Sequence, residues 1–267
     1  MTGATPLGVL GGSGFYDFLD DAQAVAVDTP YGPPSAPITL GSIDGHPVAF
    51  LPRHGVNHEF PPHRVNYRAN IWALHSLGVD RLIGPCAAGS LSADAHPGDF
   101  VVLDQLVDRT HGRPDTYFDG PELHHVGFAD PYCPRLGRVL VDAARADGVR
   151  VHERGTVVVI NGPRFSTRAE SAWYRAQGWD VVNMTQYPEA ALARELGMCF
   201  AGLALITDYD AGVHPTDVAV DMVTVLAVLR DNVTRLKSVL RRAVAISDRA
   251  GAACGCINGA PAPVAEG

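Results

Sequence analysis

The residues best suited to acid–base chemistry are two carboxylates, Asp208 and Asp210, directly after the apolar run 199–206. Burying a carboxylate costs free energy unless it has a ligand or a partner. Two of them at positions i and i+2 therefore favour a functional site over a helix cap. Apolar surroundings and a nearby like charge both raise a carboxyl pKa. One carboxyl could then hold a proton at neutral pH and act as a general acid.

Two other segments could bind an anion. In Gly11-Gly12-Ser13-Gly14 the glycines would let backbone N–H groups converge, and Ser13 adds a hydroxyl donor. The segment has neither the spacing of a dinucleotide-binding loop nor the lysine of a P-loop. Arg53 and His54 also follow an expected strand, where the guanidinium offers a planar fork of donors and His54 adds a further donor. Taken alone, the glycine segment is better explained as a tight turn. The Arg53-His54 pair is as easily a surface arginine beside a structural histidine.

Three further segments could surround a ligand. Residues 84–90 are small, which would let a ligand approach the backbone or a helix pack closely on the sheet. Within 162–168, Phe165 could stack on a planar base. Met184 offers a soft apolar wall and Thr185 a hydroxyl. Phe165 and Met184 could equally be core residues, so no single segment decides the function.

The histidines offer a candidate metal site. His54 and His58 are four residues apart, as zinc ligands on a helix are, and His63 follows. Gly55 and the Pro61-Pro62 pair oppose a helix there, so we expect no metal.

The cysteines number five, which is odd, and three lie in apolar stretches as reduced buried thiols do. Cys254-Gly255-Cys256 could be a redox pair or half of a metal site. Its Gly/Ala/Pro-rich surroundings favour two incidental thiols.

The elements that must position these residues alternate between apolar runs and amphipathic segments. A hairpin is expected at 38–52, with Asp44-Gly45 as a type I′ turn. Residues 108–134 have no period and are too long for an idle loop, so we expect them to be functional. The other strands are expected at 7–10, 81–86, 100–106, 156–160, 180–184 and 199–206, and helices at 65–77, 136–146, 168–177, 188–196 and 218–247.

This order predicts an α/β fold, a single-domain α/β/α sandwich over residues 1–249 with a frayed tail at 250–267. In such sheets ligands bind on the loops beyond the carboxyl ends of the strands. The chain has 267 residues, 46% of them hydrophobic, which suits one large core.

Composition also excludes several classes of protein. The net charge is −8 and no cluster of Lys and Arg is present, so we expect no nucleic-acid partner. No segment reads as a signal peptide or approaches the roughly 20 apolar residues that span a bilayer. We expect no membrane partner and a cytoplasmic location.

Taken together, these segments resemble the trimeric purine nucleoside phosphorylase superfamily, specifically its 5′-methylthioadenosine phosphorylase branch. The resemblance runs in order from Gly8 to about Leu229. Any one stretch is weak, but eight in the same order are specific. They are GVLGGSGFYD, DTPYGPPSAPITLG, PRHGVNHEFPPHRVNYRANIWAL, PGDFVVLDQLVDRT, ADPYCP, GPRFSTRAES, VVNMTQYPEAALARELG and ITDYD.

The resemblance implies a central mixed, partly barrel-like sheet, a homotrimer and phosphorolysis of a purine nucleoside. It implies phosphate contacts at Ser13, Arg53, His54, Cys86, Ala87 and Thr185. It implies purine-reading roles for Asp208 and Asp210, and substrate contacts at Phe165, Ser166, Met184, His125, Val220 and Val223, with His125 lent to the neighbouring subunit. Cys86 departs from the family, which has threonine there, and a thiol is the weaker donor. We therefore expect weaker phosphate affinity.

The implied reaction needs no cofactor, since inorganic phosphate is a co-substrate. Asp at both 208 and 210 and an apolar Val220/Val223 wall favour S-methyl-5′-thioadenosine. A carboxylate facing O6 of a 6-oxopurine would oppose two acceptors, at a cost of about 1–3 kcal/mol. A proton on Asp210 would reverse this, so inosine or guanosine is the alternative substrate. A nucleoside-binding protein without turnover and a His-rich metallohydrolase are the other hypotheses.

Overall fold

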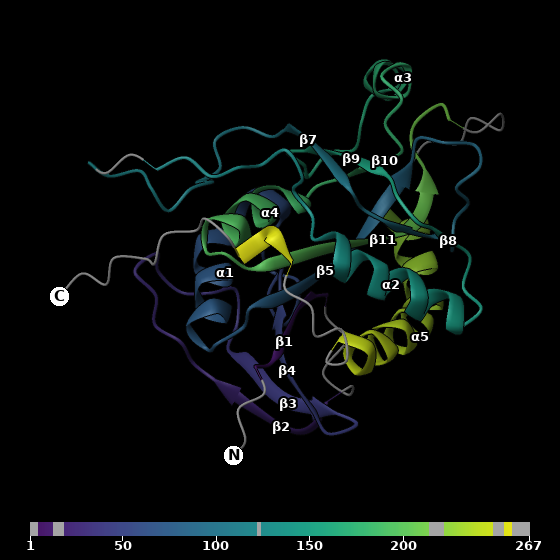
Figure 1. Cartoon of the computed structure of the whole chain (residues 1–267). Coiled ribbons are helices and arrows are strands. Elements are labelled where there is room, and N and C mark those ends of the chain that lie inside the picture. The colour runs from purple at the N-terminus through teal and green to yellow at the C-terminus, as the bar shows by residue number, and fades with distance from the viewer. Residues whose placement is uncertain (1–4, 13–18, 122–123, 214–221, 248–253, 258–267) are drawn as a thin grey trace.

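The computed structural model describes residues 5–12, 19–121, 124–213, 222–247 and 254–257. A mixed β-sheet lies between two pairs of helices (Figure 1). Helices α1 (Tyr67–Ser76) and α4 (Gln186–Glu195) cover one face, and α2 (Pro134–Ala146) and α5 (Met222–Ser247) the other. This is the predicted α/β class with helices on both faces of a mixed sheet.

The sheet of the described residues runs in the order β2-β3-β4-β1-β5-β10-β9-β7, and β11, β6 and β8 branch from it at β5. The strands of the first half are β1 (Leu7–Gly11), β2 (Asp20–Val25), β3 (Ile38–Ile43), β4 (His46–Pro52) and β5 (Arg81–Ser90). Those of the second half are β6 (Phe100–Val102), β7 (Gln105–Arg109), β8 (Val151–His152), β9 (Thr156–Ile160), β10 (Val181–Asn183) and β11 (Cys199–Tyr209).

Strand β5 is where the sheet divides. It pairs with β11 from end to end, with β1 over its first residues and with β10 over its last two. The sheet therefore branches at β5, and it is the central mixed sheet that the family resemblance implied.

The core follows from alternation along β11, since successive side chains of a strand point to opposite faces. Phe200, Ala204 and Ile206 pack on the α1/α4 side, whereas Leu203 and Leu205 pack on the α2/α5 side. A strand buried on both faces reads as a continuous apolar run, as 199–206 does.

The predicted strand at 100–106 is two strands, because the chain changes partner in between. The Leu103 N–H donates to the Gly202 carbonyl, while the Asp104 N–H donates to that of Gly155. Strands β5 and β11 extend three or four residues beyond their predicted ends at Cys86 and Ile206. Sequence reasoning missed β2, an exposed and acidic edge strand, and β8, which has two residues.

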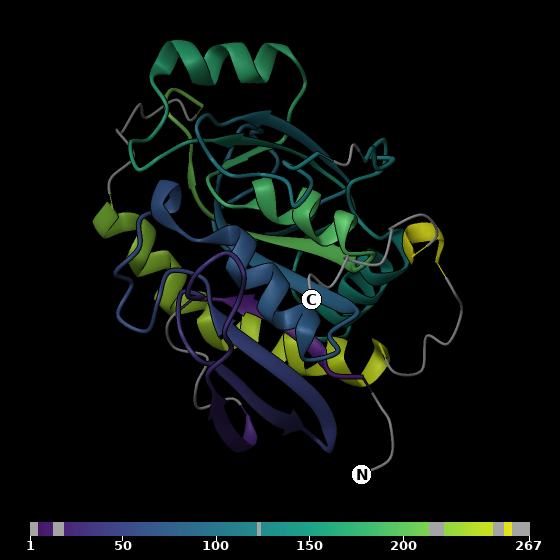
Figure 2. The ribbon, with the colours of Figure 1, turned by 90° about the vertical axis from the view of Figure 1, so that its left-hand side faces the viewer.

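The helices begin and end close to where the sequence places them. The helical part of α4 begins at Pro188, since Tyr187 is extended at φ −116° and ψ 133°. Helix α3 (Arg168–Ala176) opens with a capping box between Thr167 and Glu170 and lies at the end of the molecule away from β2 and β3 (Figures 1 and 2). In α5 the predicted start at 218 lies outside the described residues. None of the helices described is long and apolar enough to span a bilayer.

Residues 254–257 do not behave as part of a free tail. They include the short 3₁₀ turn η3 (Gly255–Ile257), and another such turn, η2 (Pro62–Arg64), precedes α1. Cys256 is 6% exposed and packs into the α2/α5 side of the core. The prediction of two incidental tail thiols is thus wrong about their surroundings.

Candidate active site

Strand β5 connects the two groups of predicted site residues. Cys86 lies opposite Ala204 on β11, and Gly89 lies opposite Asp208. Three residues of strand span about 10 Å. The predicted anion-binding end and the predicted acid end are therefore separated by roughly the length of a nucleoside with a phosphate below it.

Asp208 is directed by a β-bulge in β11. The register with β5 shifts between Ile206 and Asp208, so Thr207 is the extra residue. The Thr207 hydroxyl donates to Asp208 Oδ1 at 2.7 Å. Burial raises the pKa of Asp208, the Thr207 hydrogen bond lowers it and the neighbouring Asp210 raises it further. The net shift is upward, as the sequence predicted for a carboxyl that can hold a proton.

Gly89 makes room for both carboxyl groups. A Cβ at this position would lie 3.2 Å from Asp208 Oδ2 and 3.4 Å from the Cβ of Asp210. Any larger residue would push against them, so a glycine keeps the acid end open.

Asp210 is buried, with 3% of its surface exposed. Burial raises its pKa, while Ser171 and Ser166 act in the opposite direction. Asp210 Oδ2 and the hydroxyls of Ser166 and Ser171 are buried and make no close hydrogen bond among the described residues, so the two serines act on Asp210 at longer range. Because such groups are normally satisfied, a buried carboxyl oxygen with two buried hydroxyls nearby indicates a site for a polar ligand.

Arg53 is the best-supported anion-binding residue, and its partner was not foreseen. Its Nε donates to Glu189 Oε1 at 2.5 Å, its Nη2 to Glu189 Oε2 at 2.9 Å and its Nη1 to the Pro85 carbonyl at 3.0 Å. The guanidinium has five N–H donors. Among the described contacts three are engaged, so two remain for an anion beside Cys86.

Glu189 is 1% exposed on the inner face of α4. Burying a carboxylate costs free energy unless it is paired. Glu189 is paired with Arg53, and the two hydrogen bonds between them fix the position of the guanidinium. The sequence signal was a glutamate among mostly apolar residues of the predicted helix 188–196.

His54 takes a different role from the predicted donor. Its Nδ1 lies 2.8 Å from the Phe60 carbonyl, and since a carbonyl only accepts, Nδ1 must carry the proton. Burial and the Arg53 charge lower the pKa of His54 to about 4. At neutral pH the ring is therefore neutral, and Nε2 offers a lone pair that suits a phosphate hydroxyl. The rings of His54 and His58 stack with centroids 4.5 Å apart rather than converging on a metal.

Cys86 lies between Arg53 and two buried amides. Burial raises the pKa of its thiol to about 11, and Asn183 and Gln186 both contact it. Both polar atoms of the Asn183 side chain and Gln186 Oε1 are buried without a partner among the described residues. Sequence reasoning missed both amides. They add donors and acceptors at the anion-binding end.

Replacing Cys86 with threonine tests whether phosphate binds at the anion-binding end. Cys86→Thr is expected to lower the phosphate KM roughly three- to tenfold, because a hydrogen bond to a charged acceptor contributes about 1.5–3 kcal/mol and a thiol supplies only part of it. Steady-state kinetics at varied phosphate measures this, with Cys86→Ala as the control. A phosphate KM for the threonine variant at or above that of the alanine variant would contradict a phosphate at this position.

The remaining predicted residues divide into three groups. Thr185 is buried at the start of α4, and Ala87, Phe165 and Met184 are half-buried around the same region of β5, β10 and the segment before α3. His125 and Val223 are exposed, Val223 by 79%. Ser13 and Val220 lie outside the described residues.

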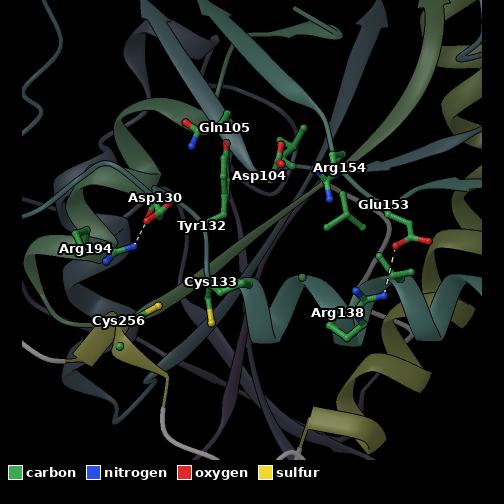
Figure 3. Close-up of a pocket in the computed structure, with 16 residues that line it drawn as sticks. Asp104, Gln105, Asp130, Tyr132, Cys133, Arg138, Glu153, Arg154, Arg194 and Cys256 are labelled. Atoms are coloured by element: carbon green, nitrogen blue, oxygen red, sulfur yellow. Dashed lines mark hydrogen bonds and ion pairs between the residues drawn. The ribbon is translucent and has the colours of Figure 1, made fainter.

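A cavity of about 550 Å³ lies elsewhere, over the start of α2 (Figure 3). Its wall carries Asp104, Asp130 and Glu153 together with Arg138 and Arg194. None of the predicted site residues lines it, so it is not where the acid and anion ends meet.

The chain is similar to several known proteins. The sequence profile of the Phosphorylase superfamily matches residues 6–245. The chain is 64% identical over 210 residues to an S-methyl-5′-thioadenosine phosphorylase of Mycolicibacterium smegmatis, covering 78% of each chain. It is 55% identical to a purine nucleoside phosphorylase of Streptomyces coelicolor, covering 90% of this chain and 88% of that one. A solved methylthioadenosine phosphorylase of Schistosoma mansoni in complex with adenine superposes with a TM-score of 0.88 at 39% identity, covering 92% of this chain and 93% of that one.

Proposed function

The chain belongs to the Phosphorylase superfamily, and on this premise we propose that it cleaves S-methyl-5′-thioadenosine with inorganic phosphate. The products are adenine and S-methyl-5-thioribose 1-phosphate. The observation that carries the proposal is the arrangement along β5. A buried arginine with two unused donors lies beside Cys86, and two carboxyls with raised pKa lie beside Gly89, three residues or about 10 Å further along the strand.

At the anion-binding end, phosphate is held below the anomeric carbon of the ribose. Arg53 donates two N–H groups, the Thr185 hydroxyl and the Ala87 N–H donate further, and His54 Nε2 accepts from a phosphate hydroxyl. The Ser13 hydroxyl completes the set. A phosphate oxygen stabilises the positive charge that develops on the ribose and then bonds to its anomeric carbon as the bond to purine N9 breaks.

At the acid end, the leaving purine takes up the electron pair of the broken bond. Burial raises the pKa of Asp208 and so favours its protonated form, which in this mechanism donates its proton to purine N7. Asp210 accepts from the exocyclic amino group of adenine, with Ser166 and Ser171 nearby. Phe165 and Met184 line the base and the ribose. Because phosphate is the nucleophile and Asp208 supplies the proton, the reaction needs no cofactor.

Two of the residues that the resemblance assigns to the 5′-substituent of the substrate, His125 and Val223, are exposed in the single chain. We include in the proposal a homotrimer in the cytoplasm, in which His125 reaches the neighbouring subunit's substrate and Val220 and Val223 form the apolar wall around the methylthio group. Light scattering checks the assembly. A fully active monomer would contradict the proposal that His125 contacts the substrate of the neighbouring subunit.

A 6-oxopurine nucleoside is the second candidate substrate. The pKa of Asp210 is raised by burial, and a protonated Asp210 would donate to O6 instead of accepting from N6. The Streptomyces coelicolor relative is named a purine nucleoside phosphorylase.

The deciding experiment is base release from S-methyl-5′-thioadenosine, inosine and guanosine, with and without phosphate. We expect release only with phosphate, and kcat/KM for S-methyl-5′-thioadenosine at least tenfold above that for inosine, since opposing two acceptors costs about 1–3 kcal/mol. The reverse order would support the second candidate. Failure of phosphate to stimulate release from any of the three would end the proposal.

A further inference from the structure

Four of the five cysteines gather at one place, far from the proposed active site. The sulfur atoms of Cys133, Cys199, Cys254 and Cys256 all lie within 4.8 Å of one another. They come from three separate parts of the chain, namely the start of α2, the start of β11 and the segment containing η3. Cys256 lies across from Cys133 beside the cavity of Figure 3.

The geometry suits one central ion better than two separate bonds. A tetrahedral zinc ion with Zn–S bonds of about 2.3 Å places its sulfur ligands about 3.8 Å apart. The four sulfurs, all within 4.8 Å of one another, can surround a single ion. The Cys199 and Cys254 sulfurs are 2.9 Å apart, closer than two zinc ligands but well beyond the S–S bond of about 2.05 Å. Cys133 also contacts the other three sulfurs rather than one partner.

The chemistry of the donor set selects the kind of metal. Thiolates favour soft or borderline ions such as zinc, and the cluster contains neither carboxylate nor imidazole. Two hydrogen-bond donors lie beside it, one of them charged. The Leu136 N–H at the start of α2 is within hydrogen-bonding reach of Cys133, and the Arg135 guanidinium is within reach of Cys199. Such groups offset the charge of a tetrathiolate and orient its ligands.

We propose that Cys133, Cys199, Cys254 and Cys256 bind one structural zinc ion that ties the segment 254–257 to the body of the protein. Zinc replaces the thiol protons, which pass to solvent, and no oxidant is needed. Four protein ligands leave no open position, as is typical of structural zinc. Cys199 is nine residues from Asp208 along β11, about 30 Å away, so the ion takes no part in the reaction.

Metal analysis of the full chain, purified without chelator from zinc-supplemented cells, tests the proposal. We expect about one zinc ion per chain, loss of that zinc from Cys256→Ser, and its retention in Cys86→Ser, which removes the fifth cysteine outside the cluster. Replacement of zinc by cobalt should produce the visible absorption of tetrahedral thiolate-bound Co²⁺. Chelator treatment should lower the unfolding temperature by several degrees, because an ion bound to the folded state alone stabilises it.

Mass spectrometry of the denatured chain distinguishes zinc-binding thiols from two disulfide bonds. All five thiols should be free once zinc is removed. A chain lighter by four hydrogen atoms would show two disulfides and overturn the proposal. Free thiols without bound zinc, even after incubation with excess zinc, would also overturn it. Base release is measured separately, so its failure and that of the zinc site are distinguishable.

Discussion

Asp208→Asn is expected to lower kcat/KM for S-methyl-5′-thioadenosine by about 10²–10⁴-fold, the usual contribution of a positioned general acid. Asparagine has nearly the same shape and still accepts from the Thr207 hydroxyl, so the pocket should keep its form. What it lacks is an acidic proton for purine N7. Steady-state phosphorolysis at saturating phosphate measures the loss, which should appear in kcat as much as in kcat/KM.

The stability of the same variant separates chemistry from folding. Because burial raises the folded-state pKa of Asp208, its stabilising contribution is present below the unfolded-state pKa of about 4 and is lost as the pH rises through the folded-state pKa. At neutral pH, Asp208→Asn should therefore be at least as resistant to heat as the unmodified protein. Asp44→Asn is the matched control, since Asp44 is an exposed turn residue at φ 51° where asparagine is readily accepted.

The control should keep full activity. An Asp208→Asn enzyme that retains more than a tenth of the original kcat would show that the proton comes from elsewhere, Asp210 being the next group along the strand.

Glu189→Ala is expected to lower the free energy of unfolding by about 3–5 kcal/mol, because it leaves the buried Arg53 charge without its partner. Denaturant titration measures the change. Glu153→Ala, which breaks exposed pairs with Arg138 and Arg145, is the control and should cost no more than about 1 kcal/mol.

Phosphate adds a sharper readout to this pair of variants. If an anion binds Arg53, it supplies the negative charge that Glu189→Ala removes. Saturating phosphate should then raise the unfolding temperature of Glu189→Ala more than that of the Glu153→Ala control. An equal rise in both would show that the anion does not depend on Arg53. A loss of stability below 1 kcal/mol would mean that the Arg53–Glu189 pair is not buried as described.

The carboxylates were recognisable from the chain alone because they come at the end of the apolar run 199–206, which is buried along its whole length in β11. Burying Asp208 and Asp210 at this place costs free energy, which indicates a functional role for them, and this argument can be made without a structure. Arg53 and His54 were recognisable only in combination with other segments, since either could stand on a surface.

Other parts of the site could not be foreseen. The pairing of Arg53 with Glu189 joins residues 136 positions apart, and no local pattern announces such a contact. The same holds for Ser171 beside Asp210. The sequence predicted His54 as a donor. In the structure its protonated Nδ1 donates to the Phe60 carbonyl, and burial together with the Arg53 charge lowers the pKa of the ring. The remaining nitrogen, Nε2, is therefore an acceptor.

The sequence by itself determined the α/β class, the order of most elements and the chemical types at each end of the site, because these depend on apolar periodicity and on the cost of burying charge. Only the tertiary structure decided the branching at β5, the bulge at Thr207 that directs Asp208, and the meeting of Cys133, Cys199, Cys254 and Cys256. The physical reason is that periodicity and burial act between neighbours, whereas sheet pairing and side-chain clusters join residues whose separation along the chain carries no signal.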